Sequence, residues 1–293
     1  CTELSCNTTD INTELLQKFE IDLKVRNLSK GTIYHYVAES YKFLNYINKS
    51  CLETTKDDVL FYFSYIQTQD YKANTQYNIR KWTKAFFTWL YENEYIARSP
   101  FDKVHLSRKE DIHKVTLTDI EVETLRDSCT SNKEIAIIDT LNSTGLRVSE
   151  LAHLRINDVD FLNKSIEVYS QKTKKYRTVY LDAKALKHIQ DYRKELDNKG
   201  IHSDYLFLGR TNNKINQTAI QNIIHKLSHK SKINKKITVH TFRKTFASRM
   251  FRLGMEAASV SKLLGHASVE TTVKNYVDID KDELKNEYRK LNS

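Results

Sequence analysis

Proline occurs once in this chain of 293 residues, at Pro100, and glycine occurs six times. Each of these residues therefore carries information about element and domain boundaries. Pro100 lies in the polar, charged stretch IARSPFDKVHLSRKEDIHKVTLTDIE, which has neither helical nor alternating periodicity. A chain of this length exceeds the usual size of a single core, so two domains are expected. We place the interdomain linker at residues 98–116.

The first domain is predicted from residues 1–97. Four segments there show the apolar spacing of helices, and no strand pattern comes between them. They are residues 10–26, 33–47, 55–68 and 79–90. The segments are rich in aromatic side chains, which at helical spacing are far more often core than platforms for stacking bases. We expect a small all-helical domain.

The second domain is predicted at residues 117–293. It opens with TLTDIEVETLRD, in which Thr118 and Glu121 have the spacing of a helix capping box. The segment KSIEVYSQKTKKYRTVYLD indicates two strands joined by a basic turn. Helices are expected at residues 132–143, 183–198 and 217–231, and over nearly all of the chain from His240 onward. The fold class predicted for the whole chain is mainly α with a small β-sheet.

Charge and apolar patterning exclude some classes of protein. The net charge of +10 fits a polyanionic partner. We find no apolar run of about 18 residues and no basic segment followed by an apolar stretch at the N-terminus, so we expect a cytoplasmic protein without a membrane anchor. The four cysteines are scattered, which favours reduced thiols over a disulfide framework or a zinc site.

The stretch TGLRVSEL is the first candidate for chemistry. Arg147 follows Gly145 at what we interpret as a turn into a helix. An arginine there presents a planar fork of donors to an anion, and the N–H groups of the helix N-terminus assist it. Glu150, one turn later, can hold the guanidinium in place.

Two further segments carry cations. In HTFRKTFASRM, His240 and Arg243 are three residues apart and share a helix face, where they can act on one phosphate. On its own this pair is an ordinary pattern of a basic surface helix. In SQKTKKYR, basic residues crowd the expected hairpin tip, and a lysine there can reach a nucleic-acid groove and protonate a leaving oxygen. These residues are Lys172, Lys174, Lys175 and Arg177.

The stretch LGHASVETTVKNYVDID supplies a histidine and a tyrosine. Gly265 is expected to end a helix, His266 follows it, and Tyr276 comes one helix later. A phenol with a pKa near 10 attacks phosphorus only when cationic neighbours stabilise the attacking oxygen and the charge that develops. Two arginines, a lysine and two histidines supply those charges without a metal. The energy of the broken phosphodiester is then kept in a phosphotyrosine, so rejoining needs no ATP.

Taken together, these four segments resemble the tyrosine recombinase (phage integrase) family in order and approximate spacing. TGLRVSEL resembles the first arginine box, HTFRKTFAS the His-x-x-Arg box, LLGHASVETT the Leu-Gly-His box and VKNYV the nucleophile segment. The N-terminal helical segment is similar to the core-binding (SAM-like) domain of that family, and the rest to its α+β catalytic domain. The resemblance covers nearly the whole chain.

The resemblance implies a role for each matching residue. Tyr276 would attack the scissile phosphate to give a 3′-phosphotyrosine and a free 5′-hydroxyl. Arg147 and Arg243 would bind the non-bridging oxygens, His240 would assist proton transfer at the nucleophile, and His266 would hydrogen-bond the phosphate. Lys172 would protonate the leaving oxygen. A shift of one or two residues in the hairpin would give that role to Lys174 instead.

The resemblance also implies partners. It predicts double-stranded DNA with inverted-repeat core sites as substrate, a Holliday junction intermediate, and a homotetramer coupled by exchange of the C-terminal helix, with no cofactor. A bacterial, phage or mobile-element origin and association with the nucleoid are expected. Because no separate domain precedes residue 10, we expect a simple core-site recombinase rather than one with separate arm sites.

Two other functions and one other site remain open at this point. A type IB topoisomerase shares the chemistry, and a DNA-binding accessory protein could keep the fold without it. The sequence does not separate integration and excision from the resolution of cointegrates or of replicon dimers. His225 and His229 lie four apart on a helix, but no third ligand is evident, so we expect no metal there. We interpret His153 as a packed or surface residue.

Overall fold

The computed structural model describes residues 8–102, 104, 115–170, 174–266 and 268–276. The chain divides into two compact units, residues 1–112 and 113–293. Each unit has its own buried apolar core. Each is described separately below.

The first unit is all-helical in its described part. It contains α1 (Thr8–Val25), α2 (Lys30–Ile47), a short 3-10 helix η1 (Cys51–Glu53), α3 (Lys56–Thr68) and α4 (Ala73–Glu92). Aromatic rings fill its core: Phe43 meets Phe87 at 5.4 Å between ring centroids, and Phe86 and Phe87 are fully buried. Phe86 and Trp89 therefore pack in the core as expected, whereas Tyr41, which has the same helical spacing in α2, is 54% exposed.

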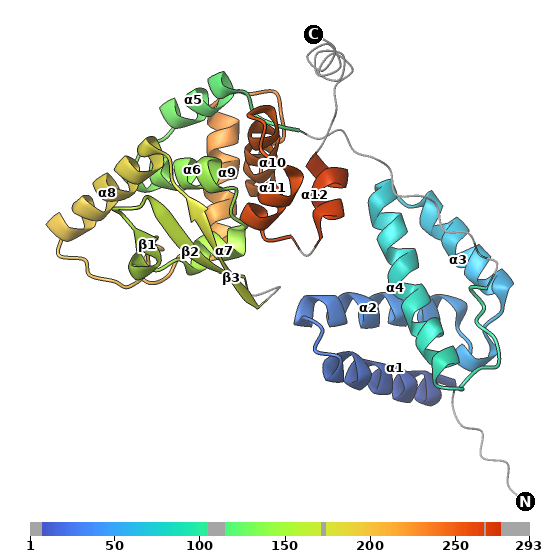
Figure 1. Cartoon of the computed structure of the whole chain (residues 1–293). Helices are drawn as coiled ribbons and strands as arrows, with labels where there is room; N and C mark the ends of the chain where they lie inside the picture. Colours follow the sequence, from blue (N-terminus) through green and yellow to red (C-terminus); the bar gives the residue numbers. More distant parts are fainter. Residues whose placement is uncertain (1–7, 103, 105–114, 171–173, 267, 277–293) are drawn as a thin grey trace, which may run out of the picture. The chain divides into compact units, whose positions relative to one another are not determined.

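The second unit begins with three helices, α5 (Asp119–Asp127), α6 (Asn132–Thr144) and α7 (Val148–His153). Thr118 and Glu121 form the predicted capping box on α5. The 3-10 helix η2 (Ile156–Asp158) then leads into a small sheet. Figure 1 shows this sheet beside α7, with α6 and α8 (Ala183–Asn198) packed on one another.

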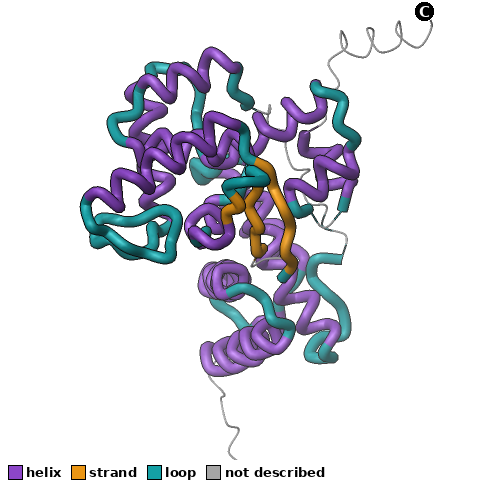
Figure 2. Tube along the Cα trace, turned by 60° about the vertical axis from the view of Figure 1, so that its left-hand side comes forward, coloured by secondary structure: helices purple, strands orange, loops and turns teal. Residues whose placement is uncertain are grey.

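The sheet is antiparallel with strand order β1 (Val159–Asp160), β2 (Ser165–Ser170), β3 (Lys175–Tyr180). Figure 2 shows its three strands among the helices of this unit. The predicted hairpin is β2 and β3, and β1 is an additional strand of two residues that the sequence pattern did not predict. Such a short segment has too few residues for alternation to be visible. In the β2–β3 register Ile166 pairs with Val179 and Val168 with Arg177.

The remaining helices are α9 (Gln217–Lys230), α10 (Val239–Arg252), α11 (Ala257–Leu264) and α12 (Val269–Tyr276). α10 contacts α6, α11 and α12, and α7 contacts α9. The predicted fold class, mainly α with a small β-sheet, is confirmed. In the described ranges no helix is long and apolar enough to cross a lipid bilayer.

Candidate active site

Arg147 lies where α6 ends and α7 begins. Gly145 ends α6 in the left-handed conformation with φ 62°, and Arg147 is the N-cap residue of α7. The Arg147 backbone N–H donates to Glu150 Oε2 at 2.9 Å, and its guanidinium Nη1 donates to Glu150 Oε1 at 2.7 Å. The prediction that Glu150 holds this guanidinium is confirmed. The guanidinium also donates from Nη2 to the Gly265 carbonyl at 3.1 Å.

Glu150 is buried and binds a second arginine. Arg177 donates from Nη1 to Oε1 at 2.9 Å and from Nη2 to Oε2 at 2.8 Å. Burial alone would raise the pKa of the Glu150 carboxyl, but the hydrogen bonds and charge of Arg177, with those of Arg147, outweigh it and lower the pKa to about 2. The carboxylate therefore stays ionised and fixes both guanidinium groups.

Arg177 was expected at the hairpin tip, and that placement is wrong. It lies within β3, where its side chain is only 9% exposed and its Nε donates to the Leu263 carbonyl at 2.7 Å. Arg177 is two residues before the buried Val179, so strand alternation places both on one face. That alternation is the sequence signal that could have found it.

Among the described residues, Arg243 is the largest of the fully buried side chains, with 1% of its surface exposed. Its Nη1 donates to the Gly145 carbonyl at 2.8 Å, and its Nη2 donates to the Leu264 carbonyl at 2.5 Å. These carbonyls end α6 and α11, where the helix dipole places partial negative charge. Two helix C-termini therefore stabilise the buried guanidinium.

His266 connects Arg243 to α12. Its Nε2 lies 3.0 Å from Arg243 Nη2, and its Nδ1 lies 2.7 Å from the hydroxyl of the buried Thr272. A guanidinium can only donate, so Nε2 accepts, and the Nδ1–H donates to Thr272. In this arrangement His266 is a neutral imidazole oriented by α12, a contact that spacing alone did not predict.

His240 is the second residue of α10, whose N-terminus is capped by Thr238. His240 is exposed to solvent. Partial burial of its ring by the surrounding protein lowers the pKa of the imidazole below the ordinary 6.5. The positive charges of Arg243, Lys244 and Arg147 lower this pKa further. The imidazole is therefore neutral at physiological pH and able to accept a proton.

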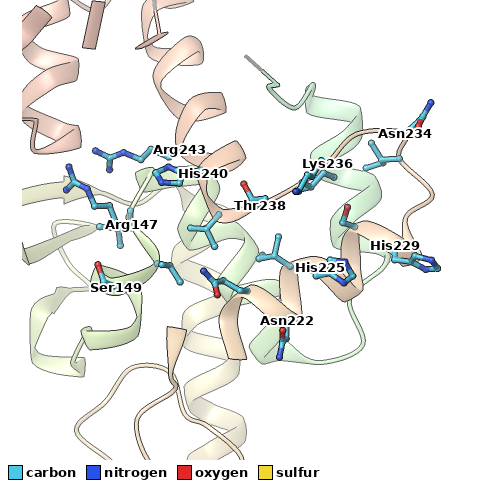
Figure 3. Close-up of a pocket in the computed structure, with 18 of the residues that line it drawn as sticks. Arg147, Ser149, Asn222, His225, His229, Asn234, Lys236, Thr238, His240 and Arg243 are labelled. Carbon is cyan, nitrogen blue, oxygen red and sulfur yellow. The ribbon is translucent and has the colours of Figure 1, made fainter. Parts of the chain in front are cut away.

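A cavity of about 1220 Å³ joins these groups to α9. Figure 3 shows Arg147, His240 and Arg243 at one end, with His225 and His229 toward the other. On α9, Ile220, Ile224 and Leu227 are buried in the core. The side chains of α9 that line the cavity are Gln221, Asn222, Ile224, His225, Ser228 and His229.

The remaining predicted residues are placed only in part. Lys172 lies outside the described residues. Lys174 closes the hairpin with φ 55°, its N–H donating to the Ser170 carbonyl at 2.8 Å. The backbone of Tyr276 ends α12, ten residues after His266, and its side chain lies outside the described part.

Comparison with known proteins bears on this arrangement. The family model described as Phage integrase family matches residues 115–283, more than half of the chain. The chain belongs to the phage integrase family. The model of the N-terminal SAM-like domain of phage integrases matches residues 15–97. The predicted family and enzyme class, a tyrosine site-specific recombinase, are confirmed.

Relatives and solved structures of the phage integrase family match along most of their length. Tyrosine recombinase XerC of Pediococcus pentosaceus is 28% identical, over 94% of this chain and 97% of that protein. A probable integrase/recombinase of Acholeplasma phage L2 is 30% identical, over 97% and 98%. The Tn1549 transposon integrase, in complex with transposon right end DNA, shares the fold at TM-score 0.80 and 20% identity, over 95% and 99%.

Three further histidines are of interest in the sequence: His225 and His229 as a candidate metal site, and His153 as a packed or surface residue. His225 and His229 are exposed on α9, and within the described ranges no group of three metal-ligating side chains occurs. His153 lies 2.7 Å from the Ser149 carbonyl through Nδ1 and 3.0 Å from Lys214 Nζ through Nε2. It is a half-buried residue of α7 with partners on both ring nitrogens.

A substitution of Gly265 tests the close approach of the Arg177 side chain to this position. With φ 64°, alanine there costs roughly 1–2 kcal/mol of backbone strain, and its Cβ would lie 3.0 Å from Arg177 Nη1 and 3.1 Å from Arg177 Cδ. We expect Gly265→Ala to lower the free energy of unfolding by more than the strain alone, as measured by urea denaturation. Gly200→Ala is the matched control, because Gly200 has φ 67° and nothing within 4 Å of the added Cβ. Equal losses in the two variants would contradict the contact.

Proposed function

We propose that this protein is a site-specific DNA recombinase that cuts and rejoins strands of double-stranded DNA through a 3′-phosphotyrosine and a Holliday junction. The single observation that carries the proposal is the meeting of Arg147, Arg243 and His240 at one end of a cavity. Two fixed guanidinium groups beside a neutral imidazole suit a phosphodiester that gains negative charge during attack. The relatives named XerC support the same class of reaction.

The proposed roles follow the chemistry of each side chain. Tyr276 attacks phosphorus through its phenolic oxygen, and the 5′-oxygen of the DNA leaves, protonated by Lys172 or by Lys174. Arg147 and Arg243 bind the non-bridging oxygens. The proton of the phenol passes to the neutral imidazole of His240. Because the phosphotyrosine keeps the energy of the broken bond, attack by a 5′-hydroxyl reseals the strand without ATP.

His266 takes a modified role in this proposal. Its Nε2 accepts from Arg243, so we propose that it orients that guanidinium for a phosphate. A hydrogen bond from His266 to the phosphate, as the family resemblance implies, requires its Nε2 to carry a proton. That is possible if the ring is protonated, or if Nδ1 gives up its bond to Thr272 and the proton changes nitrogen.

The cavity wall formed by α9 supports binding of duplex DNA. Gln221 and Asn222 are exposed there and carry uncharged amide side chains. By contrast, Lys226 of this helix pairs with Glu134 at 3.0 Å, and Lys230 donates to the Ser128 carbonyl at 2.8 Å. Amide side chains read base edges in the major groove, whereas phosphate contacts favour cations. We infer that α9 faces bases next to the cleaved strand.

The proposal does not distinguish between the possible DNA rearrangements. The relatives include XerC proteins and a phage integrase/recombinase, so integration or excision of a mobile element and resolution of a replicon both fit. The proposed substrate has inverted-repeat core sites, and the proposed active assembly is a homotetramer. Exchange of a C-terminal helix would involve residues 277–293, which lie outside the described residues.

One experiment distinguishes recombination from relaxation of supercoils. The DNA flanking the gene is footprinted, and a plasmid carrying the protected sequence is compared with a plasmid lacking it. We expect cleavage and strand exchange only on the first plasmid. Relaxation of both plasmids at equal rates would instead identify a type IB topoisomerase. Protection without a covalent adduct would identify a DNA-binding accessory protein.

The lowered pKa of His240 predicts a pH dependence of cleavage. A neutral imidazole is the proton acceptor, so the rate of adduct formation should reach a plateau at pH values well above the pKa of His240 and fall about tenfold per pH unit well below it, with the inflection under pH 6.5. Single-turnover rates on a nicked duplex measure this. In His240→Gln the rate should be lower and this inflection absent. An unchanged inflection in the variant would assign it to another group.

A further inference from the structure

A second pocket, lined in part by His266, lies between β3 and the C-terminal end of α11. Its volume is about 520 Å³. Its lining residues are Ser170, Lys175, Tyr176, Arg177, Lys262, Gly265 and His266. It shares none of its lining with the first cavity. One lining residue of each is in contact with the other, His266 Nε2 and Arg243 Nη2 at 3.0 Å.

The charge of this pocket is positive. Arg177 is balanced by Glu150, but Lys175 and Lys262 are exposed, and neither forms an ion pair with an acidic residue in the described part of the chain. The two lysines come from elements more than 80 residues apart in sequence, β3 and α11. A concave surface lined by cations of one sign raises the local concentration of an anion. Isolated surface lysines are usually only solvated, whereas this pair converges on one pocket that also contains His266.

We propose that Lys175 and Lys262 bind a phosphate next to the scissile phosphate in the same DNA strand. This inference rests on the proposed function and extends it by a second phosphate subsite. A strand held at Arg147 and Arg243 must continue past His266, with a phosphate roughly every 3.4 Å along the helix axis. Lysine ammonium groups on flexible stems suit such a contact, because they act as point charges and need no fixed fork geometry.

The pocket walls indicate why the contact is with the backbone and not with a base. Arg177 closes one side, fixed by Glu150 and by the Leu263 carbonyl. Gly265 allows the close approach of Arg177, and a side chain at that position would enter this wall. The exposed ring of Tyr176 at the rim offers a surface for a deoxyribose. The subsite would therefore position the strand and carry no base preference.

The affinity for DNA, measured over a range of salt concentrations, tests the subsite without requiring strand cleavage. The probe is a duplex carrying the footprinted sequence, or a random duplex if no sequence is protected. The proteins carry Tyr276→Phe, so that no strand is cut. Removing one phosphate contact should lower the slope of log K against log salt by about 0.9. We expect this shift for Lys175→Gln with Lys262→Gln, and none for Lys187→Gln, an exposed lysine on α8.

A methylphosphonate probe locates the phosphate. The wild-type cleavage position is mapped first, and the charge is then removed from the phosphate on its 5′ side or on its 3′ side. At the position contacted by the subsite, the Tyr276→Phe protein with both lysines present should lose the same 0.9 in slope, and the Tyr276→Phe protein with both lysines replaced should lose nothing further. An unchanged slope in the lysine variant, or equal losses for both proteins at both positions, would overturn the subsite. Failure of the wild type to form any adduct would count against the proposed function instead, because the salt slope needs no cleavage.

Discussion

Tyr276→Phe is expected to abolish the covalent protein–DNA adduct while leaving DNA binding intact. The substitution removes one oxygen atom, which is the proposed nucleophile, and keeps the ring. A nicked suicide duplex traps the adduct, because the short fragment released at the nick cannot return, and a denaturing gel separates adduct from free protein. No detectable adduct is expected for the variant at an enzyme concentration that converts most of the substrate with the wild type.

Tyr288→Phe is the matched control, since Tyr288 is the other tyrosine that follows His266 in the sequence. Its adduct yield should equal that of the wild type. Survival of the adduct in Tyr276→Phe would contradict the assignment of the nucleophile. The large effect has a physical reason: a phenol with a pKa near 10 is a weak nucleophile, and in the proposed mechanism the charges of Arg147 and Arg243 activate the oxygen of Tyr276 alone.

Glu150→Gln is expected to have the largest effect on stability. Glu150 is 4% exposed and is the shared acceptor for Arg147 and for Arg177. Removing one partner of a buried ion pair typically costs about 3–5 kcal/mol, because the other charge is left buried without compensation. Independently, the gap between the ordinary pKa of 4.5 and about 2 corresponds to about 3 kcal/mol. Urea denaturation measures the loss.

Glu123→Gln is the control for Glu150→Gln. Glu123 also contacts two cations, Arg126 and Lys184, but its side chain is 51% exposed. Surface ion pairs contribute about 0–1 kcal/mol, so this variant should lose little. A loss in Glu150→Gln as small as that in Glu123→Gln would contradict the view that Glu150 organises the arginines.

The ion pairs of Glu150 with Arg147 and Arg177 also predict a pH dependence of stability. The folded-state pKa of Glu150 is lower than its unfolded-state value, so its contribution is fully present above about pH 5 and is lost as the pH falls toward about 2. The difference in unfolding free energy between wild type and Glu150→Gln should therefore shrink as the solution is acidified. A difference that stays constant with pH would indicate that packing, not charge, causes the loss.

Much of the fold was predictable because its signals are local. The helical spacing of apolar residues, the capping box of Thr118 and Glu121, and the positive φ at Gly145 and Gly265 all depend on residues close in sequence. Glu150 lies one turn from Arg147, so their contact was predictable as well. The order of the four motifs was sufficient to indicate the family.

The remaining features of the site depend on tertiary contacts. Arg177 reaches Glu150 across 27 residues, and Arg243 reaches the Gly145 carbonyl across 98 residues. No local pattern encodes which carbonyl a buried guanidinium will meet. The bond between His266 and Thr272 depends on how the chain turns between α11 and α12. The short strand β1 forms only because β2 is beside it.

The burial of Arg243 between two helix ends has a consequence for how this enzyme can change. The carbonyls of Gly145 and Leu264 accept hydrogen bonds from that guanidinium within the folded chain. The free-energy cost of dehydrating it is therefore met during folding and not during each catalytic cycle. Substitutions that loosen the packing of α10 against α6 or α11 would weaken catalysis and thermal tolerance together. Under the proposed function, in which α9 faces bases, substitutions on the solvent side of α9 would change the target sequence and leave this internal arrangement unchanged.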